Sequence, residues 1–173
     1  FCQPEVTLSK FVNPEGNIDP FIDIYNSRMK SIHADDYYLF NKSYYLNLFS
    51  NNLAKIKMVH CELDGQIACV GIFFFCNNIV QYHLGANTKA FFKSSPTKIM
   101  LDFVREYASN RSYKYFHLGG GLGGNDDSLY QFKKGFSSQT MDFYVMKEIL
   151  NKGVYKHLSK EKSSSDYFPL YRS

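Results

Sequence analysis

The sequence predicts an α/β fold in which an antiparallel meander of strands joins a parallel pair of strands in one mixed sheet, with helices on both faces. Two turn signals, Asp64-Gly65 and Asn77-Asn78, separate three strand-like stretches and predict the meander. The stretch Gln66 to Cys76 is almost continuously apolar, which is typical of a central strand that is covered on both faces. A helix and another strand follow, and such a unit predicts parallel pairing through a right-handed crossover.

The chain up to residue 52 predicts a short strand and two helices. Residues 1–18 form a lead-in segment with one short strand. Asp19 followed by Pro20 is an N-cap signal with proline at the first helical position. The apolar face of the helix that follows consists of Phe21, Ile24, Tyr25, Met29 and Ile32. A second helix is predicted from about Lys42 to Asn52, and its buried stripe consists of Tyr45, Leu48 and Phe49.

The middle of the chain predicts the sheet. Alternation of apolar and polar residues predicts a strand from Lys55 to Leu63, and a third meander strand runs from Ile79 to Gly85. Ser95 followed by Pro96 begins a third helix by the same cap-and-proline signal. The next strand is predicted from Tyr113 to Leu118.

The last part of the chain begins with a glycine-rich segment. Five of the eleven glycines lie between Gly119 and Gly124. Asp126 or Asp127 is predicted to cap a short helix that ends at Gly135. We expect a last strand at 140–148, a final helix at 149–160 and a polar tail at 161–173. No boundary divides the chain, so residues 1–173 are predicted to form a single domain.

Composition and charge exclude few functions. The chain has 173 residues, of which 45% are hydrophobic and 21% charged, as in an ordinary globular domain. The net charge of +4 permits an anionic partner without requiring one. No apolar run is long enough to span a bilayer, so no transmembrane segment is expected. Because the chain begins at Phe1 and not at Met, we expect a fragment or one half of a two-domain protein.

The cysteines predict neither a metal site nor disulfides. Cys2, Cys61, Cys69 and Cys76 form no Cys-x-x-Cys pair, and no histidine or cysteine shows ligand spacing, so no metal is expected. Cys61 and Cys76 lie in apolar strand contexts, where a free thiol behaves as a small hydrophobic group. Reduced cysteines predict a cytoplasmic protein.

The predicted sheet has one place where a ligand is expected. Residues 83–85 and residues 116–118 are predicted to lie side by side in parallel strands, where the meander meets the parallel pair. Ligands of open α/β sheets bind at the carboxyl ends of strands at such a switch point. The glycine-rich segment follows directly at that end.

Two short sequence motifs resemble those of a known family. They are Tyr115-Phe116-His117-Leu118-Gly119-Gly120-Gly121 and Ser128-Leu129-Tyr130-Gln131-Phe132-Lys133-Lys134-Gly135-Phe136. Together with the element order, they resemble the GNAT acyltransferase fold, nearest its Fem-type (FemABX-like) branch, over roughly residues 19–160. That branch includes the aminoacyl-tRNA-dependent peptidyltransferases of peptidoglycan bridges and related acetyltransferase-like enzymes. The resemblance therefore implies a transferase that moves an acyl or aminoacyl group to an amine, with cell-envelope or glycan synthesis as its setting.

The sequence departs from this pattern in two places. Fem-type enzymes have two such domains, whereas this chain has room for one. Acetyl-CoA-dependent relatives carry a Gln/Arg-x-x-Gly-x-Gly loop after the meander, where this chain has Gly85 to Ala90 without that pattern. The donor is therefore open between acyl-CoA and aminoacyl-tRNA. The acceptor is expected to be a small-molecule or cell-wall-precursor amine, and the oligomeric state is open.

Four side chains are candidates for the chemistry. The resemblance places Lys133 near the acyl or phosphate end of the donor and Phe132 at the acyl pocket; the alternatives are a solvated helix lysine and a core phenylalanine. His83 and His117 each lie near the end of a predicted parallel strand, and either can act as a general base because imidazole titrates near neutral pH. The alternative is a half-buried histidine that is bonded to a neighbour.

The glycine-rich segment has three interpretations. It can bind donor phosphate through backbone amides, pass close to a neighbouring strand, or act as a mobile lid. The candidate donor-binding glycines are Gly119, Gly120, Gly121, Gly123 and Gly124. The segment lacks the lysine-serine ending of a nucleotide-hydrolysing loop.

Two functions from different classes remain. The first is an N-acyltransferase of the kind just described. In such an enzyme the basic residues near the end of the chain, among them Lys152, Lys156 and Lys160, could contact tRNA phosphates. The second is a non-catalytic half of a Fem-type two-domain protein that binds the acceptor or a partner.

Overall fold

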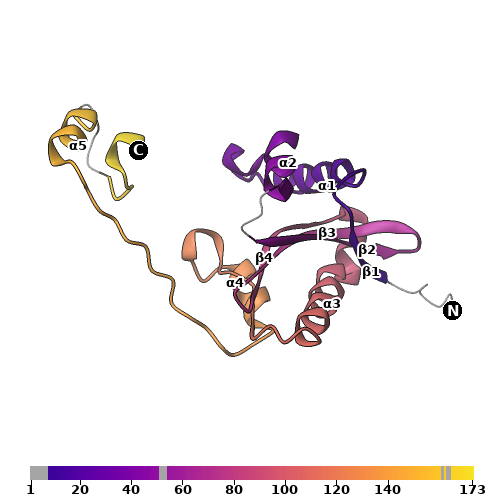
Figure 1. Cartoon of the computed structure of the whole chain (residues 1–173). Coiled ribbons are helices and arrows are strands. Elements are labelled where there is room, and N and C mark those ends of the chain that lie inside the picture. Colours follow the sequence, from indigo (N-terminus) through magenta and orange to yellow (C-terminus); the bar gives the residue numbers. More distant parts are fainter. Residues whose placement is uncertain (1–7, 51–53, 161, 163–164) are drawn as a thin grey trace. The chain divides into compact units, whose positions relative to one another are not determined.

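The computed structural model describes residues 8–50, 54–160, 162 and 165–173 (Figure 1). The chain divides into two compact units, Phe1–Phe136 and Ser137–Ser173. The prediction of one domain over residues 1–173 stays a prediction. Cys2, residues 51 and 52 of the second predicted helix, and Ser163 and Ser164 of the polar tail lie outside the described residues.

The first unit is built on one mixed sheet. Within the described residues its strands are β1 (Leu8–Val12), β2 (Lys55–Leu63), β3 (Gln66–Cys76), β4 (Ile79–Asn87) and β5 (Tyr115–His117), in that spatial order. Neighbouring strands are antiparallel except for β4 and β5, which are parallel. The predicted fold class is therefore confirmed, including the short strand of the lead-in segment.

Both hairpins of the meander depend on residues that tolerate a positive φ. Asp64 and Gly65 have φ of 52° and 71°, and Asn77 and Asn78 have φ of 47° and 64°. Glycine adopts this region without steric cost, and asparagine and aspartate enter it more readily than other residues. The two predicted turns are therefore confirmed.

Helices cover both faces of this sheet. The helices α1 (Ile18–Ser31) and α2 (Lys42–Ser50) lie on one face, and α3 (Pro96–Ser109) lies on the other (Figure 1). On the α1–α2 side the core includes Phe21, Tyr25, Tyr45, Met58 and Ile72. On the α3 side it includes Val59, Phe73, Phe75, Met100 and Val104. Consecutive residues of β3 thus point into different cores, as predicted for a central strand.

Two of the cysteines are part of the α3-side core. Cys61 of β2 lies directly opposite Cys69 of β3, and both are fully buried. Both are free thiols. The prediction of a small buried apolar group is therefore confirmed for Cys61 and wrong for Cys76, which is exposed at the end of β3.

The first helix begins earlier than its sequence signal indicates. We predicted Asp19 as the N-cap, but α1 begins at Ile18 and Asn17 precedes it, without a side-chain cap bond. Ile18 is buried with Phe21 and Tyr25. Packing of this apolar stripe against the sheet therefore determines where the helix begins, and the cap signal does not.

The parallel strand is shorter than predicted and pairs in another register. We predicted that residues 83–85 lie beside residues 116–118, and this alignment is wrong. In the structure Val80 pairs with Phe116 and Gln81 pairs with His117. Before β5, the Lys114 N–H donates to the Asn78 carbonyl at 2.8 Å, which anchors the strand at the start of β4 and not at its end.

The short helix after the glycine-rich segment agrees with its signals. The helix α4 (Ser128–Lys134) has Asp127 as its N-cap, and Gly135 follows its last residue. The Asp127 carboxylate accepts a hydrogen bond from the Tyr130 N–H at 2.8 Å. Of the two predicted caps, the structure therefore selects Asp127.

The second unit contains a short helix and no strand in its described residues. The predicted strand at 140–148 is wrong, because this segment has no partner strand to bond, and Met141, Phe143 and Met146 are 86%, 88% and 88% exposed. The predicted final helix is reduced to α5 (Lys152–Leu158), which is capped by the Asn151 side chain. No helix in the described part of the chain has the length and apolar character needed to cross a membrane.

Candidate active site

The parallel strand pair opens where β4 bulges. Opposite β3, Phe73 pairs with Tyr82 and Ile72 pairs with Leu84, so His83 is an extra residue in β4. A bulge bends its strand and increases the local twist. Within the described residues the pairing of β4 with β5 ends at Gln81, just before this bulge, and β4 continues to Asn87. The bulge therefore separates the carboxyl end of β4 from its parallel neighbour.

His83, at the bulge, is held by contacts from two other elements. Its Nε2 lies 3.1 Å from the Tyr44 hydroxyl oxygen of α2. Its ring centroid lies 4.6 Å from that of Phe74 in β3. Burial lowers the pKa of His83 from its ordinary value of 6.5, because a partly desolvated site disfavours the imidazolium ion. His83 is therefore a neutral imidazole at pH 7, which is the form that can accept a proton.

His117 lies in a different environment. It is exposed on β5 and pairs with Gln81 in the register of the strands. Among the described residues no hydrogen bond, ion pair or ring contact holds its side chain. His117 therefore lacks the positioning contacts that His83 has.

Two glycines show why the segment after β5 is rich in glycine. Gly119 has a φ of +78°. At Gly121 a Cβ atom would collide with the Asn125 carbonyl oxygen and the Asp127 carboxylate. The segment therefore folds back tightly on the chain that follows it, and this close approach requires a residue without a side chain.

We expect a Gly121→Ala substitution to destabilise the first unit by about 1–3 kcal/mol, because the added methyl group forces the backbone and the Asp127 carboxylate apart. Gly120→Ala is the matched control, since a Cβ there meets no atom within 4 Å. Urea unfolding of both variants measures the difference. Equal stability of the two variants would contradict the close approach at Gly121.

Asp127 ties the glycine-rich segment to α4. Its carboxylate accepts the Leu122 N–H at 2.9 Å and the Tyr130 N–H at 2.8 Å. These hydrogen bonds lower the pKa of Asp127 from its ordinary value, because they stabilise the charged carboxylate. The Gly124 N–H also donates within the segment, to the Gly121 carbonyl at 3.4 Å. Of the candidate donor-binding glycines, Gly124 thus has its backbone amide engaged internally, as has Leu122 in the same segment.

Lys133 reaches from α4 back to the same segment. Its Nζ donates to the Gly120 carbonyl at 2.7 Å and lies 3.3 Å from the position that a Cβ of Gly119 would occupy. Burial lowers the pKa of Lys133 from its ordinary value of 10.5, and the nearby Asp127 carboxylate acts in the opposite direction. The structure therefore brings Lys133 together with the candidate donor-binding glycines, and the lysine is not merely a solvated helix residue.

Phe132 packs mainly against protein. It is half-buried against the α3-side core, and its ring lies 5.3 Å from the Phe136 ring in an edge-to-face arrangement. These contacts anchor α4 beneath the glycine-rich segment. A role for Phe132 in bounding an acyl pocket stays a prediction.

Sequence reasoning missed Tyr44, which is the partner of His83. It lies next to Tyr45, which was predicted to belong to the buried stripe of the helix. In the structure the Tyr45 side chain is fully buried, whereas the Tyr44 side chain is half-buried. Phe40, two residues before α2, packs against Tyr44 inside the helix, and no local sequence signal predicts this contact. Their rings stack at 4.2 Å.

Among residues 8–50, 54–160, 162 and 165–173, no group of three or more His, Cys, Asp or Glu side chains could hold a metal ion. The candidate groups are instead an imidazole and a phenol at the β4 bulge, and an amine and backbone amides at the glycine-rich segment after β5. These groups can accept a proton, donate hydrogen bonds and stabilise negative charge. Such properties suit acyl transfer to an amine.

Comparisons with solved structures show the same fold. A ribosomal-protein-alanine N-acetyltransferase from Brucella melitensis biovar Abortus 2308 matches with a TM-score of 0.61 and 12% identity, over 83% of this chain and 100% of that one. The aminoglycoside acetyltransferase meta-AAC0020 from an uncultured soil metagenomic sample, in complex with sisomicin, matches with a TM-score of 0.60 and 10% identity, over 82% and 97%. A predicted acetyltransferase with acetyl-CoA from Clostridium acetobutylicum matches with a TM-score of 0.58 and 16% identity, over 84% and 97%.

At the level of sequence, a search of curated proteins found no match. The model of the acetyltransferase (GNAT) domain family, however, matches residues 5–134, which is more than half of the chain. This range includes the β4 bulge, the glycine-rich segment and Lys133. The chain therefore belongs to the acetyltransferase (GNAT) domain family and is an acyltransferase enzyme.

Proposed function

We propose that this acyltransferase moves an acyl group from an acyl-CoA donor to the nitrogen of an amine acceptor at the opening between β4 and β5. The observation that carries the proposal is the bulge at His83, which places a neutral imidazole where the parallel strands separate. The Tyr44 hydroxyl, 3.1 Å from His83 Nε2, supports the orientation of this ring. A related fold with acetyl-CoA is known from Clostridium acetobutylicum, and this supports the donor.

The proposed reaction needs one proton acceptor and one site for negative charge. The acceptor ammonium loses a proton to His83, and the free amine attacks the thioester carbonyl carbon. The new C–N bond forms, the C–S bond then breaks, and the coenzyme A thiolate leaves and takes up a proton. Lys133 serves as the cation that stabilises negative charge of the donor phosphate or of the developing oxyanion.

The connection from β4 to α3 supports a donor that contains pyrophosphate. After β4 the chain forms the short 3₁₀ helix η2 (Lys89–Ser94), and α3 then begins at Pro96. Lys89 and Lys93 are exposed on this connection, and Lys98 is exposed in the first turn of α3. The amino end of a helix also carries partial positive charge, so this connection combines two sources of attraction for an anion.

The Fem-type resemblance supports a second donor. The segment from Gly85 to Ala90 lacks the glycine pattern of acetyl-CoA-dependent relatives. The motif that contains Phe132 and Lys133 resembles the corresponding motif of Fem-type enzymes. In that case the donor is an aminoacyl-tRNA and the acceptor a cell-wall precursor. A chain that only binds its acceptor, as one half of a larger protein, is the remaining alternative.

We expect coenzyme A to raise the thermal stability of the first unit. At one hundred times its dissociation constant, a ligand that binds only the native state adds about 2.7 kcal/mol. Differential scanning fluorimetry measures the shift, and glutathione at the same concentration is the control, because it has a thiol but no pyrophosphate. A shift only with an aminoacyl-tRNA analogue would replace acyl-CoA by the Fem-type donor. No shift with either ligand on a folded protein would favour the non-catalytic alternative.

A further inference from the structure

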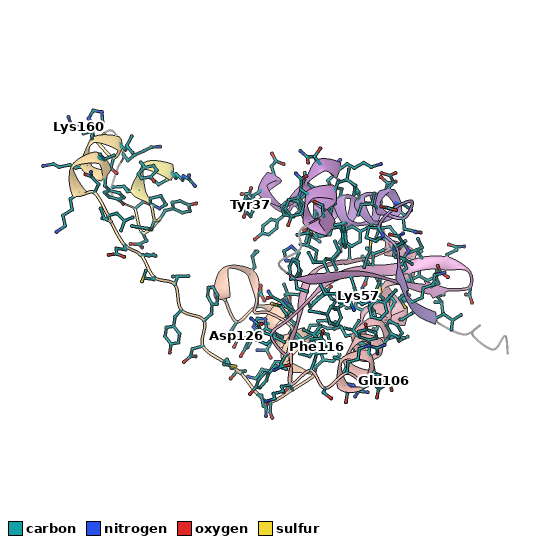
Figure 2. All side chains as sticks on the ribbon, in the orientation of Figure 1. Tyr37, Lys57, Glu106, Phe116, Asp126 and Lys160 are labelled. Carbon is teal, nitrogen blue, oxygen red and sulfur yellow. The ribbon has the colours of Figure 1, made fainter. Side chains whose placement is uncertain are left out.

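The surface beside His83 consists mainly of aromatic side chains. Four aromatic residues form what we call the aromatic rim: Tyr37 and Tyr38 of the 3₁₀ helix η1 (Asp36–Tyr38), Phe40 of the connection that follows, and Tyr44 of α2. Tyr44 at one end of the rim is bonded to His83. Tyr37 at the other end is 77% exposed, and Figure 2 shows it at the edge of the α1–α2 layer. The rim therefore leads from solvent to the proposed base.

The rings of the rim support one another. Phe40 stacks on Tyr44 with centroids 4.2 Å apart. Tyr37 meets Phe40 at 6.4 Å and Tyr38 at 5.5 Å, in both cases edge to face. A single exposed tyrosine is common on protein surfaces. An exposed tyrosine that completes a packed series of rings ending at a catalytic candidate is a better indication of a binding surface.

The backbone under Tyr37 is held in place before any ligand binds. The Asp35 side chain accepts the Tyr37 N–H at 2.9 Å, and the Asp35 carbonyl accepts the Tyr38 N–H at 2.9 Å. Less conformational freedom is then lost when a ligand binds. The turn therefore presents the Tyr37 ring as a preorganised contact.

The charge around the rim is negative. Asp35 and Asp36 are exposed in the same turn, and residues 33–41 contain no lysine or arginine. Lys42 lies between Phe40 and Tyr44, and its charge is paired with Asp19, with Nζ and Oδ1 2.7 Å apart. The rim therefore attracts a cation, and the face of an aromatic ring adds to this attraction through its negative quadrupole.

From these properties we propose that the acceptor is an amino sugar, and this inference rests on the acyltransferase function proposed above. The C–H face of a sugar ring packs on the Tyr37 and Phe40 rings, and its hydroxyl groups bond to the phenols of the rim. Asp35 and Asp36 attract its ammonium group as the sugar approaches the rim, and the bound sugar then gives a proton to His83. An apolar amine would leave the phenol hydroxyl groups that it covers without partners, and this costs binding energy.

The first test measures binding without any turnover. Saturation-transfer NMR of the wild-type chain with glucosamine should show transfer to the ring C–H protons, and glucose, which has no ammonium group, should show much less. Tyr37→Ala should weaken glucosamine binding about tenfold, so that its signal falls strongly, and Tyr37→Phe should keep the signal, because the ring survives. Tyr144→Ala is the matched control, since Tyr144 is 83% exposed in the second unit. An unchanged signal in Tyr37→Ala would overturn the proposal.

The second test measures acyl transfer as thiol release from acetyl-CoA. Glucosamine or an aminoglycoside should give a kcat/KM at least tenfold above that of ethanolamine or of a peptide with a free amino-terminal alanine. Tyr37→Ala should raise the KM for the sugar about tenfold with little change in kcat. Equal or better turnover of ethanolamine or the peptide would overturn the amino-sugar inference and leave the acyltransferase proposal intact. Absence of both turnover and a coenzyme A stability shift would contradict the acyltransferase proposal instead.

Discussion

Replacement of His83 by glutamine is expected to lower kcat/KM by about 10²- to 10⁴-fold, which is the usual contribution of a general base. Glutamine can still bond to the Tyr44 hydroxyl, so the bulge of β4 and its packing against Phe74 should persist. What the variant loses is a group that accepts a proton near neutral pH. Steady-state measurement of thiol release from acetyl-CoA gives the rate, and thermal unfolding shows whether the fold is kept.

The pH profile of the wild-type enzyme distinguishes this role from a structural one. Burial lowers the pKa of His83, so the active neutral form persists below pH 6.5, and activity should fall only as the pH passes through this lowered pKa. The His83→Gln variant should lose that acidic limb. The free energy of unfolding should depend on pH in the same direction. The stability that comes from keeping His83 neutral in the folded protein is complete above pH 6.5 and is lost as the pH falls through the lowered pKa.

His117 provides the comparison for His83. It is a histidine of the neighbouring strand, but it is exposed and has no positioning contact among the described residues. His117→Gln should therefore leave kcat/KM within a few-fold of the wild type. A large loss in this variant together with a small loss in His83→Gln would exchange the two roles and contradict our assignment.

Replacement of Lys133 by methionine is expected to lower kcat by about 10²- to 10³-fold, as removal of one group that stabilises an oxyanion typically does. Methionine keeps an unbranched side chain that can pack in the half-buried position, so the change removes mainly the ammonium group. The lost hydrogen bond to the Gly120 carbonyl should cost only about 0.5–1.5 kcal/mol of stability. Turnover should therefore fall much more than stability.

Lys134 is the matched control for this substitution. It follows Lys133 on the same helix and is exposed, and among the residues that the structure describes its ammonium group contacts only the Tyr130 ring, at 5.7 Å from the ring centroid. Lys134→Met should change neither turnover nor stability appreciably. If instead Lys133→Met lost stability in proportion to activity, the lysine would be a structural tie between α4 and the glycine-rich segment and would have no part in the chemistry.

Most of the local elements were predictable because their signals act within a few residues. The two hairpin turns required residues that tolerate positive φ, and the chain has Asp64-Gly65 and Asn77-Asn78 there. Alternation along Lys55–Leu63 predicted β2 with its observed bounds. Asp127 caps α4 by bonding an amide only three residues away.

The errors occurred where a distant partner is needed. Residues 140–148 alternate as a strand does, yet a strand forms only when another strand completes its hydrogen bonds, and the second unit has none in its described residues. The register of β5 was wrong for a related reason. It is anchored by the bond from Lys114 to Asn78, which lies in a turn far away in sequence.

The sequence by itself determined the order of most elements, the turns between them and the two segments, around Gly119 and around Lys133, that contain candidate site residues. Only the tertiary structure decided which contacts these residues make. It placed the bulge at His83, brought Tyr44 to it from 39 residues away, and turned Lys133 back onto the Gly120 carbonyl. Turn and cap preferences are local properties of a few residues, whereas a bulge and a contact between distant side chains depend on how whole strands and helices pack.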